Sequence, residues 1–307
     1  NCFSPAGEFN VCLPFARDFE VFRSRGNGFE IIYEKGKGMK KFLLSLLVAA
    51  LASSALCARS LSEIKSSGVL RIGVYDAQPP FSKIEDGVHQ GFEVDMANAI
   101  AKDMLPSGGK VEFTSVLANQ RIKFLQEDKV DAVIATLTVT PEREKQIDFT
   151  TPYFSVNIGI LTRVEDKIKS LNELQDKTIL VLSGGTAETY FEKQGYNIAR
   201  CDNANACYKA LKAGQGDGYA DDNLVVLAYP VLDKKVEVNI KNLGTSDFLA
   251  IGVKKGNSEL LDFLNGELIK LSKEGFFKNS FDNFIEPYYK GTAEKKYFLL
   301  DDLYSLL

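Results

Sequence analysis

From Leu61 onward the chain alternates between two hydrophobic patterns. Short apolar runs bounded by polar residues predict buried strands, and apolar residues spaced three or four positions apart predict amphipathic helices. Met96, Ile100 and Met104 recur every four residues, for example, and predict a helix over residues 92–105. The same pattern predicts further helices over 119–126, 186–194, 203–213, 258–273 and 275–283, and strands over 69–75, 111–116, 131–136, 156–162, 177–182, 197–201, 217–220 and 248–254.

This order of elements predicts the fold class. Strands that alternate with helices form parallel sheets covered on both faces, and the alternation restarts near residue 163, which indicates a second sheet. No Gly/Ser-rich linker separates the halves, so ordered strands are expected to join them, as hinge closure requires. We therefore predict an α/β protein of two lobes, each a mostly parallel sheet flanked by helices, joined by hinge strands, with a ligand site between them.

Residues 39–57 have the pattern of a targeting segment. Met39-Lys40-Lys41 supplies a positive start, and residues 42–56 form an apolar run followed by small residues, as in a secretory signal peptide. We interpret residues 39–57 as that signal peptide and residues 1–38 as leader sequence upstream of the native protein. Export to the periplasm follows, and Cys57 leaves a lipid anchor open, although Leu56 is bulkier than a lipoprotein signal prefers.

The remaining chain is divided by the same patterns. Lobe 1 is predicted to comprise residues 58–155 and 247–287, and lobe 2 residues 156–246. Residues 288–307 form a tail, in which Phe298, Leu299, Leu303 and Leu306 have the spacing of a short amphipathic helix.

Composition narrows the classes of function. The 307 residues carry 37 Lys and Arg against 41 Asp and Glu, a net charge of −4, and contain no long basic run, so nucleic acid is not an expected partner. A single His excludes a His-rich metal site, and we expect no cofactor. Beyond residue 57 the cysteines are Cys201 and Cys207, for which a disulfide and two buried thiols both remain open.

Four sequence blocks follow one another along the mature chain. They are GVYDAQPPF at 73–81, GFEVD at 91–95, DAVIATLTVTPER at 131–143 continued by IDFTTPY at 147–153, and GQGDGYADD at 214–222. In this order, after a signal peptide, they resemble the family 3 extracellular solute-binding proteins, the periplasmic polar amino-acid-binding proteins of ABC transporters. The resemblance runs from about residue 61 to residue 284. It implies a monomeric, non-enzymatic receptor that closes around a free amino acid and delivers it to membrane permease subunits with a cytoplasmic ATPase.

The resemblance also implies a set of ligand-binding residues, and the chemistry of an amino acid supports it. A dry cleft must offer a fixed cation to the ligand carboxylate and a fixed anion to the ammonium. Arg143 is expected to clamp the carboxylate, because guanidinium pairs with it bidentately, and Asp222, or the adjacent Asp221, to pair with the ammonium. Backbone and hydroxyl groups are expected from Thr136, Thr138, Gly185 and Thr186.

Residues around the ligand side chain should set its identity. Asp76, Phe81 and Arg121 are expected there. Relatives that bind acidic ligands and relatives that bind cysteine both have an arginine where Arg121 stands, so cysteine or cystine, glutamine and acidic amino acids all remain open. An alternative class is enzymatic, because cyclohexadienyl and arogenate dehydratases share this fold. Structural interpretations also exist: Arg143 as a surface residue of a charged turn, and Asp222 as a helix cap.

Overall fold

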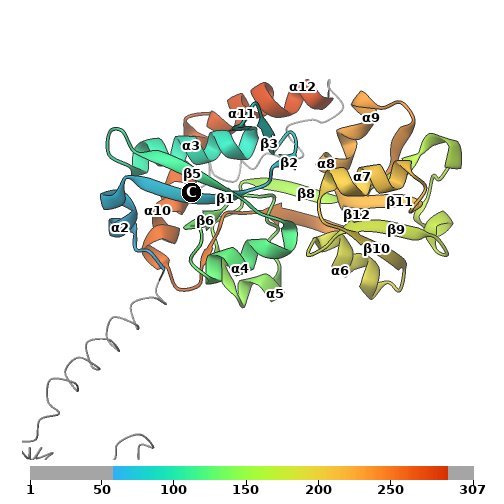
Figure 1. Ribbon diagram of the computed structural model, residues 1–307, viewed down its shortest axis with the longest axis horizontal. Helices are drawn as coiled ribbons and strands as arrows, with labels where there is room; N and C mark the ends of the chain where they lie inside the picture. Colours follow the sequence, from blue (N-terminus) through green and yellow to red (C-terminus); the bar gives the residue numbers. More distant parts are fainter. Residues whose placement is uncertain (1–57, 290–307) are drawn as a thin grey trace, which may run out of the picture. The chain divides into compact units, whose positions relative to one another are not determined.

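The computed structural model describes residues 58–289 (Figure 1). The predicted leader, the signal peptide with Cys57, and the tail from residue 290 lie outside the described residues. Within residues 58–289, no helix is both long enough and apolar enough to cross a membrane.

The first sheet forms the centre of lobe 1, with strand order β5–β1–β6–β13–β7. β1 pairs in parallel with β5 and β6, and Ile72 on β1 lies between Phe113 on β5 and Ala132 on β6. β13 is antiparallel to both β6 and β7. The strands are β1 Val69–Val74, β5 Lys110–Ser115, β6 Ala132–Val133, β7 Ile147–Phe149 and β13 Gly252–Lys254.

Helices cover both faces of this sheet, with α3 on one side and α4 on the other (Figure 1). α3 buries Met96, Ile100 and Met104, as their four-residue spacing predicts. It begins after Gly91, where φ is +131° and a Cβ would collide with the carbonyl oxygen of Phe81, so only glycine fits. The helices are α2 Leu61–Ser67, α3 Phe92–Met104, α4 Arg121–Gln126, α5 Pro141–Glu144, α10 Ser258–Lys273, α11 Phe276–Ser280 and α12 Glu286–Tyr289, and a small antiparallel sheet comprises β2 Ala77–Gln78, β3 Ser82–Glu85 and β4 Val88–Gln90.

The second sheet forms the centre of lobe 2, with strand order β10–β9–β11–β8–β12. β9 is parallel to β10 and β11, whereas β8 is antiparallel to β11 and β12. α6 covers one face, and α7 and α8 cover the other (Figure 1). The elements are β8 Phe154–Arg163, β9 Thr178–Leu182, β10 Asn197–Cys201, β11 Gly218–Asp222, β12 Val236–Leu249, α6 Thr186–Lys193, α7 Ala204–Lys212, α8 Asn223–Leu227 and α9 Tyr229–Leu232.

One two-stranded ribbon joins the two sheets. β8 and β12 pair antiparallel from Phe154 opposite Leu249 to Arg163 opposite Val236. The register of this pair shifts three times along its length. At the lobe 1 end the strands continue into β7 and β13, which also pair with each other. Both predicted lobe boundaries fall inside this ribbon.

Two predicted strands differ from the observed ones. The run 131–136 contributes only Ala132–Val133 to a strand, because Thr136 adopts a φ of +39° and gives its N–H and carbonyl to side chains instead of to the sheet. The run 248–254 is divided between β12 and β13, because the chain passes from the second sheet to the first between Leu249 and Gly252.

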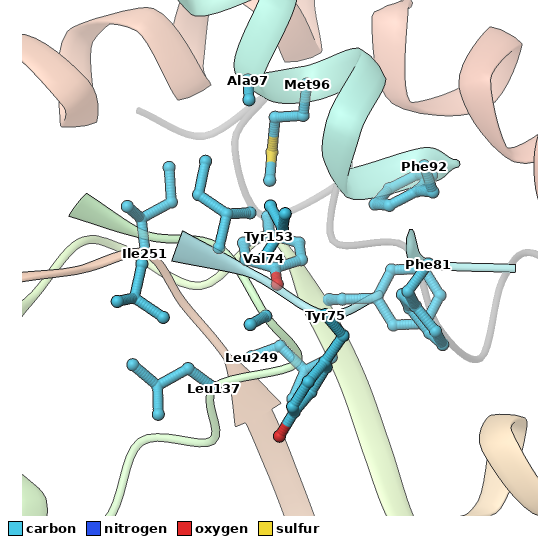
Figure 2. Packing of buried hydrophobic residues seen from close by; sticks show 14 of the residues in the cluster. Val74, Tyr75, Phe81, Phe92, Met96, Ala97, Leu137, Tyr153, Leu249 and Ile251 are labelled. Atoms are coloured by element: carbon cyan, nitrogen blue, oxygen red, sulfur yellow. The ribbon is translucent and has the colours of Figure 1, made fainter. Parts of the chain in front are cut away.

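Hydrophobic packing and one disulfide hold these elements together. Figure 2 shows the lobe 1 part of the larger core, where the Phe81 ring packs edge-on against Phe92 and Phe154 with centroids 6.3 and 5.5 Å apart. Cys201 and Cys207 form a disulfide with their Cα atoms 5.4 Å apart, which decides between the two interpretations of these cysteines. The bridge ties the end of β10 to the first turn of α7.

Candidate ligand-binding site

A small cavity lies between the two lobes, beyond the carboxyl ends of β1, β6 and β9 and at the end of β11. The space that it leaves free is about 10 Å³, roughly enough for one water molecule. Its lobe 1 lining is Tyr75, Gln78, Ala118, Arg121, Thr136 and Thr138, and its lobe 2 lining is Leu182, Gly185, Thr186, Asp221 and Asp222.

Arg121 is a buried cation in this lining, with 3% of its surface exposed. Its Nε donates to the carbonyl oxygen of Ala118 at 2.9 Å, and its Nη1 donates to those of Ala135 and Thr136, both at 2.9 Å. Nη2 reaches across to the carbonyl oxygen of Gly184 in lobe 2 at 3.2 Å. Within residues 58–289 no carboxylate forms an ion pair with Arg121, and the hydrogen bonds of its guanidinium all go to backbone carbonyl oxygens.

Arg143 converges on the same carbonyl oxygen from α5. Its Nη2 donates to the Gly184 oxygen at 2.9 Å, and its Nη1 donates to the carbonyl oxygen of Thr138 at 2.7 Å. The Thr140 hydroxyl caps α5 by accepting the N–H of Arg143 at 3.3 Å. Burial, reinforced by the neighbouring Arg121, lowers the pKa of Arg143 to about 10. Two guanidinium groups therefore meet on one side of the cavity, where an anionic group would offset their repulsion.

Two carboxyl groups end β11 in the lobe 2 lining. Asp221 accepts the Tyr219 hydroxyl at 2.5 Å and the backbone N–H of Asp222 at 2.8 Å. Burial raises the pKa of Asp221 to about 6. Burial and the adjacent Asp221 carboxyl raise the pKa of Asp222 well above its ordinary range. A cation placed beside Asp222 would counter both causes.

Thr136 is held at the cavity by three buried side chains. Its N–H donates to Oε1 of Glu93 at 2.6 Å, and its hydroxyl accepts Nε2 of Gln78 at 3.1 Å. Its carbonyl oxygen accepts Nη1 of Arg121. Oε1 of Glu93 also accepts the Tyr153 hydroxyl at 2.5 Å, and burial raises the pKa of Glu93 to about 7.

In the glycine turn before α6, two backbone N–H groups are already hydrogen-bonded within lobe 2. The N–H of Gly184 donates to Oε2 of Glu188 at 2.6 Å, and that of Gly185 donates to the carbonyl oxygen of Leu182 at 3.0 Å. Gly184 instead turns its carbonyl toward the two arginines. Gly185 and Thr186 line the cavity.

The structure gathers most of the predicted site residues and separates two of them. Asp76 is exposed and accepts the Ser115 hydroxyl at 2.5 Å. Phe81 is fully buried in the aromatic cluster of Figure 2, away from the cavity lining. Of the predicted residues, those that line the cavity are Arg121, Thr136, Thr138, Gly185, Thr186 and Asp222, with Asp221 as the alternative to Asp222, and Arg143 contacts its edge through Thr138.

Sequence reasoning missed Tyr75, Gln78 and Glu93. Tyr75 points its hydroxyl away from the aromatic cluster in Figure 2 and belongs to the cavity lining. Glu93 carried a signal that could have found it. It precedes Ala97 by four positions and so places a carboxyl group on the apolar stripe of its helix.

A two-lobed α/β chain with a charged cavity between its lobes has the architecture of a solute-binding protein. The chain belongs to the bacterial extracellular solute-binding proteins, family 3, whose family model matches residues 70–287. The ABC transporter glutamine-binding protein of Bacillus subtilis is 32% identical over 203 residues, covering 65% of this chain and 74% of the relative.

Two solved structures give the same result. The solute receptor for L-cysteine of Neisseria gonorrhoeae has a TM-score of 0.76 at 36% identity, covering 78% of this chain and 99% of that one. The cysteine-binding protein of Campylobacter jejuni has a TM-score of 0.76 at 34% identity, covering 78% and 98%. The predicted family and the two-lobed α/β fold class are confirmed, although each sheet combines two parallel with two antiparallel pairs of neighbouring strands instead of being mostly parallel.

Proposed function

We propose that this protein is the exported substrate-binding component of an amino-acid ABC importer. It binds one free polar L-amino acid between its lobes and passes it to membrane permease subunits driven by a cytoplasmic ATPase. The observation that carries the proposal is the charge arrangement of the cavity: Arg121 and Arg143 on one side, and Asp222 on the other. An amino acid offers the matching carboxylate and ammonium. Relatives named for glutamine and cysteine support this ligand class.

Each end of the ligand has a proposed partner. Arg143 and the remaining N–H of Arg121 bind the α-carboxylate, and Asp222 binds the ammonium, which restores the charged form of that carboxyl group. A charge-assisted hydrogen bond contributes roughly 1.5–3 kcal/mol, whereas micromolar affinity needs about −8 kcal/mol. Both ends must therefore be bound together, with the lobes closed around them.

Among cysteine or cystine, glutamine and acidic amino acids, we favour cysteine. Both solved relatives described above are named for cysteine. The family description supports a position outside the cytoplasm, which for this chain is the proposed periplasmic location.

We also propose that the protein is not an enzyme, as the names of its relatives as binding proteins favour. The dehydratase alternative requires a general acid, and buried carboxyl groups with raised pKa, such as Asp221, have that property. Incubation with prephenate and with arogenate, with detection of an aromatic product, separates the two classes. Product formation at a catalytic rate would contradict the receptor function.

A thermal-shift screen against the twenty amino acids and cystine tests the function, after refolding to remove any carried-over ligand. A ligand at a hundredfold excess over its Kd stabilises the native state by about 2.7 kcal/mol. We expect a clear shift with one or a few amino acids, cysteine foremost. No shift with any of them would refute the proposal.

Substitution of the charged residues tests the site. Arg143→Ala and Asp222→Ala should each weaken binding by about tenfold or more in isothermal titration calorimetry, because each removes the partner of one charged end. Glu142→Ala, on the exposed side of α5, and Asp76→Ala, outside the cavity, are matched controls and should leave the affinity unchanged. Equal affinities in all four variants would refute this site.

A further inference from the structure

We infer that Glu93 is a positioning residue of the binding site, which fixes the conformation of Thr136 and through it that of Arg121. This inference rests on the proposed function and adds to it a residue that does not touch the cavity. Glu93 has no exposed surface and does not belong to the cavity lining. Its hydrogen bond to the cavity lining is the one that it accepts from the N–H of Thr136, which does line the cavity.

The conformation of Thr136 is one that threonine adopts only when its surroundings impose it. Its φ of +39° lies in the left-handed region, which is a genuine outlier for a β-branched residue. Such backbone strain persists where several contacts together determine the conformation, and it is concentrated at functional sites. The position of Thr136 in the cavity lining agrees with this pattern.

Three elements supply the contacts that impose this conformation. Each polar group of Thr136 has one buried partner, and each partner comes from a different element: Glu93 from α3 on the N–H, Arg121 from α4 on the carbonyl oxygen, and Gln78 from β2 on the hydroxyl. The Glu93 bond is the shortest of the three, at 2.6 Å. Without Glu93 the Thr136 N–H would be buried with no acceptor, which a folded protein avoids.

The contact between Glu93 and Thr136 also affects the position of a charged side chain in the cavity. Nη1 of Arg121 donates to the carbonyl oxygens of Ala135 and Thr136, so the backbone turn that Glu93 holds also orients the guanidinium. Glu93 is also an acidic group that experiences the positive charge of Arg121, and Arg121 has no carboxylate ion-pair partner among the described residues. Moving the turn at 135–136 would move the cationic side of the cavity.

Glu93 is poorly explained as a residue for stability alone. Its Oε2 is buried and has no hydrogen-bond partner among residues 58–289, an arrangement that a purely structural position disfavours. Its Oε1 serves two partners, Thr136 and Tyr153. Only the first of these partners belongs to the cavity lining, which gives a matched pair of contacts for a test.

A double-mutant cycle on the full chain tests the inference, with cysteine or the amino acid found in the screen as the probe. Glu93→Ala and Glu93→Gln are each made in the natural chain and in a Thr136→Gly background, where glycine adopts a positive φ without strain. We expect Glu93→Ala to weaken binding by about tenfold in the natural chain and by less than about threefold in the Thr136→Gly background. Glu93→Gln, which keeps an acceptor oxygen, should lose less affinity than Glu93→Ala and show the same dependence on background, so it also serves if Glu93→Ala fails to fold.

Tyr153→Phe is the matched control. It removes the other partner of Oε1 and should lower the Tm while changing the affinity by less than about twofold. A second readout needs no ligand: exchange of the Thr136 amide hydrogen should accelerate in Glu93→Ala and remain slow in Tyr153→Phe.

The outcomes separate this inference from the function on which it rests. Equal losses of affinity in both backgrounds, or no loss in a folded Glu93 variant, would overturn the positioning role while leaving the receptor function intact. If the unmodified protein binds no amino acid, the proposed function fails, and the binding role of Glu93 fails with it.

Discussion

Burial of a carboxyl group beneath the ligand site makes the stability of this protein depend on pH. Burial raises the pKa of Glu93 from its ordinary 4.5 to about 7, and the groups that bear on it are Arg121 and Tyr153. The folded protein therefore binds this proton more tightly than the unfolded chain does. The stabilisation is fully present below 4.5 and is lost as the pH rises through 7. Asp221 acts in the same direction, with a pKa of about 6.

Urea denaturation across this range measures the effect. The free energy of unfolding of the ligand-free protein should fall between about pH 5 and about pH 8, with an upper limit near 3 kcal/mol from Glu93. The Glu93→Gln variant does not titrate at this position and should show a shallower slope. Identical slopes in the two proteins would show that Glu93 is charged throughout this range.

Individual residues also show how much of this site the sequence predicts. Arg143 and Asp222 were predicted from the resemblance, and an amino acid's two charges gave a reason for them. Asp76 was predicted and Tyr75 was not, although they are neighbours, because adjacent residues after a strand face opposite ways and a one-residue offset changes the side. Phe81 was predicted to contact the ligand. Its ring packs instead in the aromatic cluster, because an apolar side chain is more stable where it is more fully buried.

At the scale of elements, a helix of four residues holds Arg143. α5 spans Pro141–Glu144, and the Thr140 hydroxyl caps it. Thr140→Ala should remove about 1 kcal/mol of capping energy and weaken ligand binding by about two- to fivefold, because the cap bonds to the N–H of Arg143 itself. Calorimetric titration and thermal melting measure the two effects.

A second cap provides the control. Asn203 caps α7, whose residues do not line the cavity, by accepting the N–H of Ala206 at 2.9 Å. Asn203→Ala should lower the Tm comparably and leave the affinity unchanged. A similar affinity loss in both variants would mean that capping acts on binding only through overall stability.

The predicted helices all occur, whereas two of the predicted strands differ, for a physical reason. Helical periodicity identifies a face, and α3 buried the face that its sequence indicates. An apolar run indicates that a segment is buried, but it does not indicate whether a neighbouring strand or other side chains bury it. Residues 131–136 are all buried, yet Thr136 is buried by Glu93 and Arg121 rather than by strand pairing. Periodicity likewise cannot indicate that residues 248–254 divide between two sheets.

At the scale of the whole molecule, Gly184 is a point of close contact between the lobes. Its φ is +84°, and a Cβ there would lie 2.8 Å from the Cα of Asn119 in lobe 1. Gly184→Ala should therefore keep the lobes apart and weaken binding by about tenfold or more. Small-angle scattering should show a smaller radius of gyration on ligand addition for the unmodified protein and no such change for this variant.

Gly195 separates the effect of closure from that of the backbone. Its φ of +76° is similar, but nothing lies within 4 Å of the position that a Cβ would take there, so alanine at this residue meets no other lobe. Gly195→Ala should lose stability from its backbone conformation alone and should bind and contract normally. If Gly184→Ala also binds and contracts normally, the two lobes do not need this contact to close.

The ribbon of β8 and β12 limits how the molecule can respond to its ligand. Two independent connections would let one lobe rock, slide and twist against the other. Hydrogen bonds between the two strands prevent most of these motions and leave bending of the ribbon about one axis. The three shifts of register make this bending easier. If the protein closes on its ligand as proposed, occupancy of the cavity sets the bending angle between the lobes. A membrane partner that gauges this angle from the outer faces of the lobes can distinguish a loaded molecule from an empty one without contacting the amino acid.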